Sequence, residues 1–209
     1  MMDQMRPILE AGLGQLGLDT GAVPALSEYA RLLLETNQVM NLTGKTVADV
    51  GSGAGFPGLP LKILCPSIQL TMVDSLGKRV NFLQTVCDAL HLTGVEAIHA
   101  RAEEFAASHR AGFDIVTSRA VAALPVLSEL CLPLVKEGGW FLAMKSVDSD
   151  AETAAAAHAL EILGGRLEKT EDYVIPGTDV CHRLLFIKKV KETPKKYPRA
   201  FAKIKKNPL

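Results

Sequence analysis

The feature that most constrains the fold of this chain is a glycine-rich turn that directly follows a short apolar run. The run, residues 46–50, is β-prone, and Gly51, Gly53 and Gly55 follow it. Glycine lets the backbone turn tightly and approach a ligand closely. A helical stretch begins near residue 59, so its N-terminus would face whatever the turn holds. This order of strand, glycine turn and helix is typical of the first unit of an open α/β sheet.

β-prone and helical stretches alternate along the rest of the chain, which predicts an α/β fold. Strands that alternate with helices form a mostly parallel sheet covered on both faces. A hydrophobic content of 48% in 209 residues is sufficient for one such core. The first forty residues are predicted to be helical, and the last two strands to form an antiparallel hairpin around residues 176–177. The predicted strands are 46–50, 68–73, 95–99, 113–118, 139–145, 166–174 and 183–189, and the predicted helices that follow the first strand are 59–65, 78–90, 102–108, 121–135 and 150–163.

Composition and cysteine spacing argue against several other classes of protein. No apolar run reaches the about 18 residues of a membrane span. Residues 1–18 contain acidic side chains and no continuous apolar stretch, so we do not expect a secretory signal there. The four cysteines lie far apart without a C-x-x-C pair, which argues against a zinc site and against a disulfide framework. We therefore expect free, buried thiols in a cytoplasmic protein that holds no metal.

The formal net charge of zero hides an uneven distribution. Residues 188–209 carry nine Lys or Arg and one Glu, so the rest of the chain is acidic by the same margin. A cationic end on an otherwise acidic protein indicates a polyanion partner that this end contacts. The alternative is a solvated end that contacts nothing.

The spacing of the glycines distinguishes between ligand classes. The dinucleotide pattern G-x-G-x-x-G requires glycine at its sixth position, where this chain has Phe56. The phosphate-binding pattern G-x-x-x-x-G-K-[ST] does not occur. The string from Asp49 to Gly55 reads acid-x-G-x-G-x-G, and it resembles the first motif of Rossmann-like S-adenosylmethionine-dependent methyltransferases. The alternatives are a dinucleotide site and a structural glycine loop with two solvated acids.

Two acids in the sequence fit the ligand that this motif implies. Asp49 carries a charge opposite to the ammonium of S-adenosylmethionine. Asp74 lies 23 residues beyond Gly51, at the end of the second predicted strand. An acid at that position can accept hydrogen bonds from the two hydroxyls of a ribose. The glycines would let the backbone approach the amino-acid and ribose parts of the same ligand.

Further strings make the resemblance specific to one family. The strings are Asn41-Leu-Thr43, Asp49-Val-Gly-Ser-Gly-Ala-Gly-Phe-Pro-Gly58, Asp74-Ser-Leu-Gly-Lys-Arg79, Phe82-Leu83, Arg101-Ala-Glu-Glu-Phe105, Ser118-Arg-Ala120 and Thr193-Pro-Lys-Lys-Tyr-Pro-Arg199. Together with Lys145 and Arg183, they resemble the bacterial 16S ribosomal RNA guanine-N7 methyltransferases, the RsmG or glucose-inhibited division protein B family. The match runs from the N-terminal helices to the string that ends at residue 199.

The resemblance implies a Rossmann-like class I methyltransferase fold, with a mainly parallel seven-stranded sheet, helices on both faces and additional N-terminal helices. It implies an N-terminal helical extension at 1–43, a methyltransferase domain at 44–190 and a basic C-terminal tail at 191–209. It also implies S-adenosylmethionine as the cofactor, with S-adenosylhomocysteine as its product and no metal. The implied cofactor-binding residues are Asp49, Gly51, Gly53, Gly55, Phe56, Asp74, Ser75, Leu76, Ala102, Glu103 and Arg119.

The implied reaction is methyl transfer to N7 of a guanosine in the decoding-site loop of 16S ribosomal RNA. Methyltransferases that act on amines often carry an acid-Pro-Pro-aromatic string after the fourth strand, whereas this chain has Ser-Arg-Ala there. Arginine cannot act as a base, and N7 presents a lone pair with no proton to remove. Arg119, Lys145 and Arg183 are therefore expected to act as catalytic residues that orient the RNA electrostatically, without a general base. The expected RNA-binding residues are Lys188, Lys189, Lys195, Lys196 and Arg199, and the expected partner of this monomer is 16S rRNA or the small ribosomal subunit, with no membrane contact.

The chain departs from the family pattern at one place. In the family a few tens of residues, including a His-containing helical segment, separate N-L-T from the first strand. Here Gly44 follows Thr43 directly. We favour the hypothesis that a mobile lid belongs at this position in the intact protein, because active-site lids often move. An intact mass equal to 22.4 kDa would contradict this hypothesis.

Two other functions stay open from the residues alone. A small-molecule methyltransferase would act on metabolites and would give the cationic end no role. A noncatalytic RNA-binding module would keep the fold without transferring a methyl group. Incubation with labelled S-adenosylmethionine and either ribosomal subunits, naked rRNA or metabolites separates these functions from the first.

Overall fold

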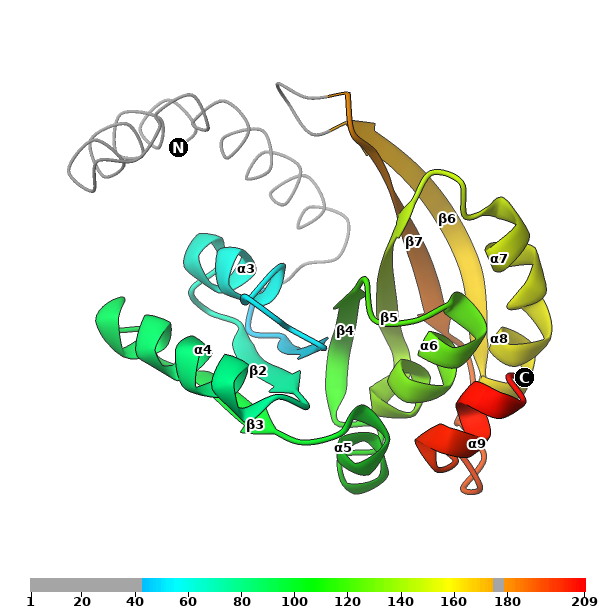
Figure 1. The fold of residues 1–209 in the computed structure, drawn as a ribbon, viewed down its shortest axis with the longest axis horizontal. Helices are drawn as coiled ribbons and strands as arrows, with labels where there is room; N and C mark the ends of the chain where they lie inside the picture. The colour runs from blue at the N-terminus through cyan, green and yellow to red at the C-terminus, as the bar shows by residue number, and fades with distance from the viewer. Residues whose placement is uncertain (1–42, 175–178) are drawn as a thin grey trace.

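The computed structural model describes residues 43–174 and 179–209. Within these ranges, seven strands form one sheet in the order β3-β2-β1-β4-β5-β7-β6 (Figure 1). The first five run parallel, β7 is antiparallel to β5, and β6 is antiparallel to β7. The predicted mainly parallel sheet and its final antiparallel pair are therefore confirmed. The strands are β1 (Thr46–Val50), β2 (Gln69–Asp74), β3 (Val95–His99), β4 (Phe113–Arg119), β5 (Val135–Ser146), β6 (Gly165–Val174) and β7 (Cys181–Lys189).

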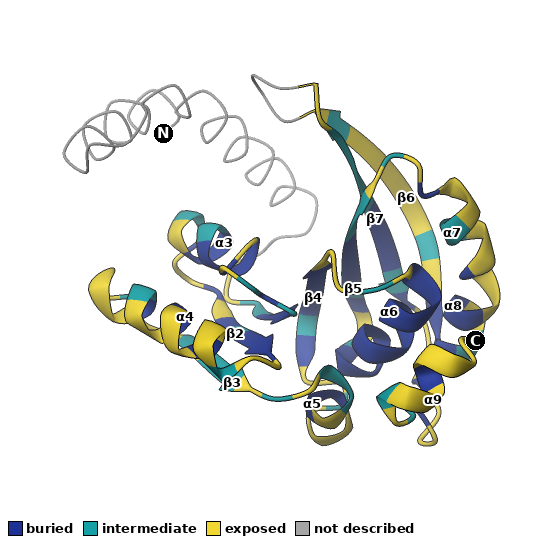
Figure 2. Ribbon diagram, in the orientation of Figure 1, coloured by how far each residue is buried: buried dark blue, intermediate teal, exposed yellow. Residues whose placement is uncertain are grey.

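Helices cover both faces of the sheet, as predicted (Figures 1 and 2). On one face, α3 (Gly58–Leu64) and α4 (Gly77–Ala89) contribute to one cluster of buried apolar side chains. On the other face, α5 (Ala102–Ser108), α6 (Leu124–Cys131), α8 (Ala157–Leu163) and α9 (Phe201–Lys206) contribute to a second. The central strands β1 and β4 are buried along most of their length, because helices cover both faces of a parallel sheet. The predicted N-terminal helices fall in residues 1–42, outside the described residues.

Successive side chains of the central strands divide between these two clusters. Val47 and Ile115 pack on the face of α3 and α4, whereas Ala48, Val50 and Val116 pack on the face of α6. A strand has this two-residue period because successive Cβ atoms point to opposite faces. The same alternation decides on which face each polar side chain near a strand end lies.

The structure differs from the sequence prediction in two helices. The helix predicted at 121–135 begins at Leu124, ends at Cys131 and continues as a short 3₁₀ turn, so residues 120–123 form a loop after β4. Pro125 stands in the first turn of α6, where its missing N–H leaves no helical partner unsatisfied. The helix predicted at 150–163 divides into α7 (Asp150–Ala155) and α8 at the fully buried Ala156, whose N–H bonds to the carbonyls of both Glu152 and Thr153.

Residues 191–209, predicted to be a basic tail, pack against the body of the protein (Figure 1). Tyr197 and Ile204 are buried in the same cluster as α6. Arg110, which precedes β4, donates a hydrogen bond to the carbonyl of Thr193 at 2.5 Å and another to the carbonyl of Tyr197. The segment therefore lies at the amino ends of the parallel strands.

Candidate functional site

A cavity of about 530 Å³ lies where the carboxyl ends of β1, β2 and β4 meet. In the sheet, β1 stands between β2 and β4, so the chain crosses to opposite sides of β1 on its way to these two strands. Ligands of open α/β sheets bind at such a switch point, outside the carboxyl ends of the strands. The predicted cofactor residues that line the cavity are Gly51, Gly53, Asp74, Ser75, Ala102 and Arg119.

The glycine turn is joined to the end of the neighbouring strand. The N–H groups of Gly51 and Ser52 donate to the carbonyl of Val73 at 2.8 and 3.2 Å. Gly51 has a φ of +74°, and a Cβ at this position would overlap the side chain of Val121. Only glycine fits a left-handed backbone that is packed this closely. The turn therefore keeps its backbone open to the cavity on one side and packed on the other.

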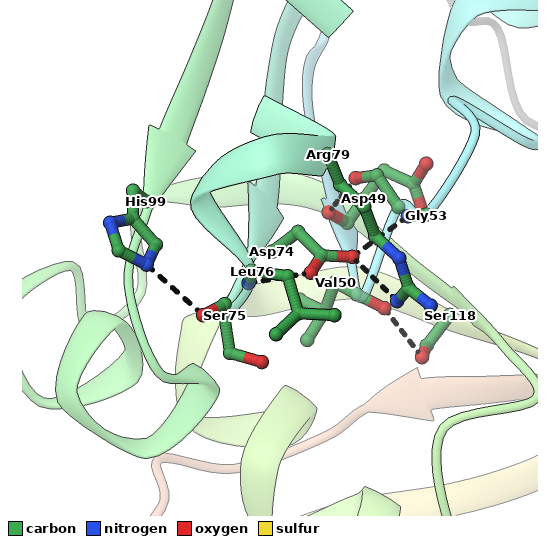
Figure 3. A network of polar contacts seen from close by, with 10 residues as sticks. Asp49, Val50, Gly53, Asp74, Ser75, Leu76, Arg79, His99 and Ser118 are labelled. Carbon is green, nitrogen blue, oxygen red and sulfur yellow. Dashed lines mark hydrogen bonds and ion pairs between the residues drawn. The ribbon is translucent and has the colours of Figure 1, made fainter. Parts of the chain in front are cut away.

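Asp74 connects the two loops that form the floor of the cavity (Figure 3). Its side chain is 3% exposed, and its Oδ2 accepts a hydrogen bond from the N–H of Gly53 at 3.0 Å. Its Oδ1 accepts one from the N–H of Leu76 at 2.9 Å, and Arg79 Nη1 lies 3.4 Å from Oδ2. Each carboxylate oxygen has two lone pairs, so Oδ1 keeps acceptor capacity toward the cavity.

Asp49 lies in a different environment from the one that the sequence suggested. Its side chain is fully buried and is not among the groups that line the cavity. Its Oδ2 accepts a hydrogen bond from the N–H of Gly58 at the start of α3, at 3.1 Å, while no described group bonds its Oδ1. Burial raises the pKa of Asp49 to about 7, because an apolar environment disfavours the charged form. This acid fixes the beginning of α3 and does not line the cavity, so its contact with a ligand stays a prediction.

Four other predicted cofactor residues stand outside the lining of the cavity. Gly55 is buried with a φ of +92°, and Glu103 is half-buried in the first turn of α5. Phe56 and Leu76 are about half exposed, at 44% and 52%. The ring of Phe56 lies 5.9 Å from the guanidinium of Arg119, beside the cavity.

Sequence reasoning missed several residues at this edge. Arg79 lines the cavity and contacts Asp74, and its signal was its place in the D-S-L-G-K-R string. His99 Nε2 lies 3.0 Å from the carbonyl of Ser75 and so supports the loop after β2 (Figure 3). The hydroxyl of Ser118 donates to the carbonyl of Val50 at 2.8 Å and joins the ends of β4 and β1. No local pattern indicates the last two pairings, because His99 and Ser75 lie 24 residues apart and Ser118 and Val50 lie 68 apart.

The three predicted catalytic cations share the carboxyl edge of the sheet, but two of them have charged partners. Arg119 is exposed, lines the cavity and pairs in register with Met144 of β5. Lys145 pairs in register with Arg183 of β7. Its ammonium donates to the carbonyl of Ala122 at 2.6 Å and forms an ion pair with Glu152.

Arg183 is enclosed by two carboxylates. Its Nε and Nη2 donate to the two oxygens of Asp172 at 2.6 and 2.8 Å, and its Nη1 donates to Asp150 at 2.5 Å. The hydrogen bonds from Arg183 lower the pKa of Asp172, which therefore stays ionised. A phosphate could reach Arg183 or Lys145 only by competing with these acids.

Two of the five predicted RNA-binding residues are bound to groups of the protein itself. Lys189 is 2% exposed, and its ammonium donates to the carbonyls of Leu132 and Leu163 and to the hydroxyl of Thr193. Arg199 donates from Nε and Nη2 to the buried carboxylate of Glu129, at 2.8 and 2.6 Å. Both cations hold the C-terminal segment in place, so contact with RNA would require them to leave these protein partners.

The other three predicted RNA-binding residues are less buried than Lys189. Lys188 is half-buried, with its ammonium 4.1 Å from the centroid of the Trp140 ring. Lys195 and Lys196 are exposed. Because β7 ends at the amino edge of the sheet, these lysines lie at the edge opposite the cavity. In the part of the chain that the structure describes, no helix is long and apolar enough to cross a membrane.

Solved structures of other proteins share this fold. The structure resembles TrmN from Thermus thermophilus with a TM-score of 0.60 and 18% identity, over 77% of this chain and 49% of that one. It resembles M. jannaschii TYW2, solved in complex with AdoMet, with a TM-score of 0.59 and 15% identity, over 75% of this chain and 76% of that one. At these identities the likeness supports the fold alone.

Sequence comparison is more specific. The family model GidB, rRNA small subunit methyltransferase G, matches residues 44–176. A protein of that name from Clostridium botulinum (strain ATCC 19397 / Type A) is 52% identical over 167 residues, which cover 79% of this chain and 70% of the relative. One from Levilactobacillus brevis is 52% identical over 233 residues, which cover 95% of this chain and 96% of the relative.

The alignment with the Levilactobacillus relative is longer than the 209 residues of this chain, so that relative carries residues that this chain lacks. The family match begins at residue 44, directly after Thr43, where the sequence departs from the family pattern. The match, which spans residues 44–176, covers more than half of the chain. The chain belongs to the GidB family, the rRNA small subunit methyltransferases G.

Proposed function

We propose that this protein transfers a methyl group from S-adenosylmethionine to N7 of a guanosine in the decoding-site loop of 16S rRNA. Family membership makes the protein an S-adenosylmethionine-dependent methyltransferase of small-subunit rRNA. The observation that carries the finer proposal is the composition of the cavity at the switch point of the sheet. The lining of this cavity combines an open glycine turn, the buried carboxylate of Asp74 and the exposed guanidinium of Arg119.

The residues present fit S-adenosylmethionine. The cavity volume of about 530 Å³ lies within the roughly 300–1,000 Å³ of small-molecule sites. Gly51 and Gly53 leave room for the amino-acid part, and Asp74 Oδ1 has acceptor capacity for a ribose hydroxyl. Ala100 and Ala102 offer a small apolar wall for the adenine. When bound, the cofactor supplies a methyl group on a positively charged sulfur.

The lining of the cavity supports an acceptor that needs no deprotonation. Among the described residues of the lining, the titratable side chains are Asp74, Arg79 and Arg119. Asp74 already binds two backbone N–H groups and Arg79, and an arginine cannot accept a proton. Guanine N7 presents a lone pair without a proton, whereas an exocyclic amine must lose one. Catalysis by this chain is then positioning together with electrostatic stabilisation.

Arg119 is the residue best placed to meet the RNA at this edge. It is exposed, lines the cavity and has a planar guanidinium that can bind a phosphate or a base edge with two hydrogen bonds. We assign it the orientation of the target nucleotide. Lys145 and Arg183 lie at the same edge, but they could contribute directly only if a phosphate displaced their carboxylate partners.

The exposed lysines at the opposite edge provide a second surface for RNA. Lys195 and Lys196 are joined there by Lys203, Lys205 and Lys206, which are also exposed. An RNA that contacted both edges would have to pass around the sheet, which favours a large folded RNA or an assembled subunit as the partner. Phosphate contacts of this kind position an RNA without reading its sequence. We propose that the protein acts as a cytoplasmic monomer on this partner.

The direct test is incubation with labelled S-adenosylmethionine and either small ribosomal subunits, naked 16S rRNA or a metabolite extract. Nuclease digestion and mass spectrometry then identify the methylated nucleoside. Label in 7-methylguanosine from the decoding-site loop supports the proposal. Label in an exocyclic methylguanosine or in a metabolite contradicts it.

A further inference from the structure

The loop after β4 lies against the glycine turn through a strained backbone. Ala120 has a φ of +55°, which non-glycine residues rarely adopt. Its neighbour Val121 lines the cavity and lies in the space that a Cβ on Gly51 would take. Arg119 precedes this strained position directly. Such a conformation persists only where the surrounding structure holds it.

Two charged side chains from outside the cavity hold this loop. Glu152 on α7 accepts a hydrogen bond from the N–H of Leu124, the first residue of α6. The same oxygen, Oε1, forms an ion pair with Lys145 at the end of β5. Lys145 in turn donates to the carbonyl of Ala122 at 2.6 Å. The pair therefore binds one donor and one acceptor of the backbone that connects Arg119 to α6.

We infer that Glu152, together with Lys145, is a positioning residue that fixes loop 120–123 against the glycine turn and so sets the cofactor pocket and the placement of Arg119. The side chain of Lys145 is 10% exposed and that of Glu152 is 29% exposed, so the pair is shielded from water on most sides. Removing one partner of such a pair leaves an uncompensated charge. The inference rests on the proposed function, because it takes the cavity as the site of S-adenosylmethionine.

This role differs from the one that the sequence suggested for Lys145. A direct contact with RNA phosphate would make Lys145 independent of Glu152 and of the cofactor. In the structure its ammonium is directed at Ala122 and Glu152. Neither Glu152 nor Lys145 lines the cavity, so any effect of Glu152 on cofactor binding must pass through the loop.

The test compares Glu152→Ala, Glu152→Gln, Lys145→Met and the double variant Lys145→Met/Glu152→Gln with the unchanged protein. Glu161→Ala is the matched control, because Glu161 is an exposed acid on the neighbouring helix α8. Calorimetry without RNA, at a temperature well below the melting temperature of each variant, gives the affinity for S-adenosylmethionine. Single-turnover and steady-state methylation of small subunits give the turnover rate and the KM for RNA.

We expect Glu152→Ala to weaken cofactor binding about tenfold, by analogy with the loss of one charged hydrogen bond, and to lower turnover with little change in the KM for RNA. Glu152→Gln keeps an acceptor for the N–H of Leu124, so it should lose less cofactor affinity and less turnover than Glu152→Ala. Because the two residues act as one unit, the double variant should be no worse than Lys145→Met. Glu161→Ala should leave cofactor affinity and turnover unchanged.

Any one of the following results would overturn the inference. Cofactor affinity in Glu152→Ala could equal that of the unchanged protein. The effects of Lys145→Met and Glu152→Gln could add, or Lys145→Met could change only the KM for RNA and its salt dependence. A lowered melting temperature with unchanged affinity in the cold would show a purely structural role. If the unchanged protein itself bound no S-adenosylmethionine, the proposed function would fail first.

Discussion

The N–H of Gly53 donates to Asp74 Oδ2 at 3.0 Å, so the acid that ends β2 holds the glycine turn that follows β1. The parallel register makes this possible, because it sets Val50 beside Val73 and brings both strand ends to one edge. The same carboxylate also accepts the N–H of Leu76. One side chain thus shapes both loops and lines the cavity between them.

Replacing Asp74 should therefore affect both cofactor binding and stability. Asp74→Ala removes an acceptor from two backbone N–H groups and one charge near Arg79. We expect S-adenosylmethionine affinity to fall by about one to two decades, and the free energy of unfolding to fall by about 1–3 kcal/mol. Calorimetry and urea unfolding measure the two effects. Glu96→Ala, at an exposed acid of β3, is the control, and unchanged affinity in Asp74→Ala would remove this residue from the site.

Local patterns predicted the mainly parallel sheet and its final antiparallel pair, and they placed the glycine turn at the edge where the cavity lies. Alternating strands and helices impose a parallel sheet, and the glycine turn marks the switch point. The position of Asp74 at the end of β2 followed from the same reasoning. The length of the helix after β4 did not, since the loop at 120–123 is held by Glu152 and Lys145 from distant parts of the chain.

Burial of charged groups could not be predicted in the same way. Counting charge from Lys188 to Leu209 treats every cation alike, yet Lys189 lies under three oxygen acceptors and Arg199 lies on Glu129. Asp49 was correctly placed on β1, but the motif does not say that its side chain bonds the start of α3. In each case the deciding partner is distant in the sequence or on another element.

Arg119 should be required for turnover more than for folding, because it is exposed and ends β4 at the edge of the cavity. Arg119→Lys keeps the charge and loses the planar pair of donors. If Arg119 orients a phosphate or a base, this change should lower single-turnover methylation of small subunits by about one decade or more. Arg119→Ala should also lower the rate of methylation, without changing the melting curve. Full activity of Arg119→Ala would show that the Ser-Arg-Ala string has no catalytic role.

The exposed C-terminal lysines should contribute to RNA affinity through counterion release. Replacing Lys195, Lys196 and Lys203 by Gln should leave S-adenosylmethionine binding unchanged and weaken binding to 16S rRNA. The slope of log affinity against log salt falls by about 0.7 for each lost contact with a single strand. Three lost contacts would therefore flatten the slope by about 2. Filter binding at several salt concentrations measures it, and an unaltered slope would mean that these lysines are only solvated.

Lys189→Met is the contrasting variant, because Lys189 is a structural cation. Its loss leaves the carbonyls of Leu132 and Leu163 without this donor and loosens Thr193. We expect the free energy of unfolding to fall by about 1–3 kcal/mol, with the salt slope of RNA binding unchanged. Deleting residues 191–209 would not make this distinction, since it would also remove Tyr197 and Ile204 from the core. A changed salt slope without a loss of stability would contradict the structural role.

Asp49 should make the stability of the protein depend on pH near neutrality. Burial raises its pKa from 3.8 to about 7. Between these values the folded protein holds a proton that the unfolded chain has released, so stability falls as pH rises from about 4 to 7, by at most about 1.4 kcal/mol per pH unit. Asp49→Asn keeps an oxygen for the N–H of Gly58 and cannot ionise. Urea unfolding at pH 5, 6, 7 and 8 should therefore show the Asn variant gaining stability relative to the unchanged protein as pH rises, and two parallel curves would show that Asp49 does not titrate in this range.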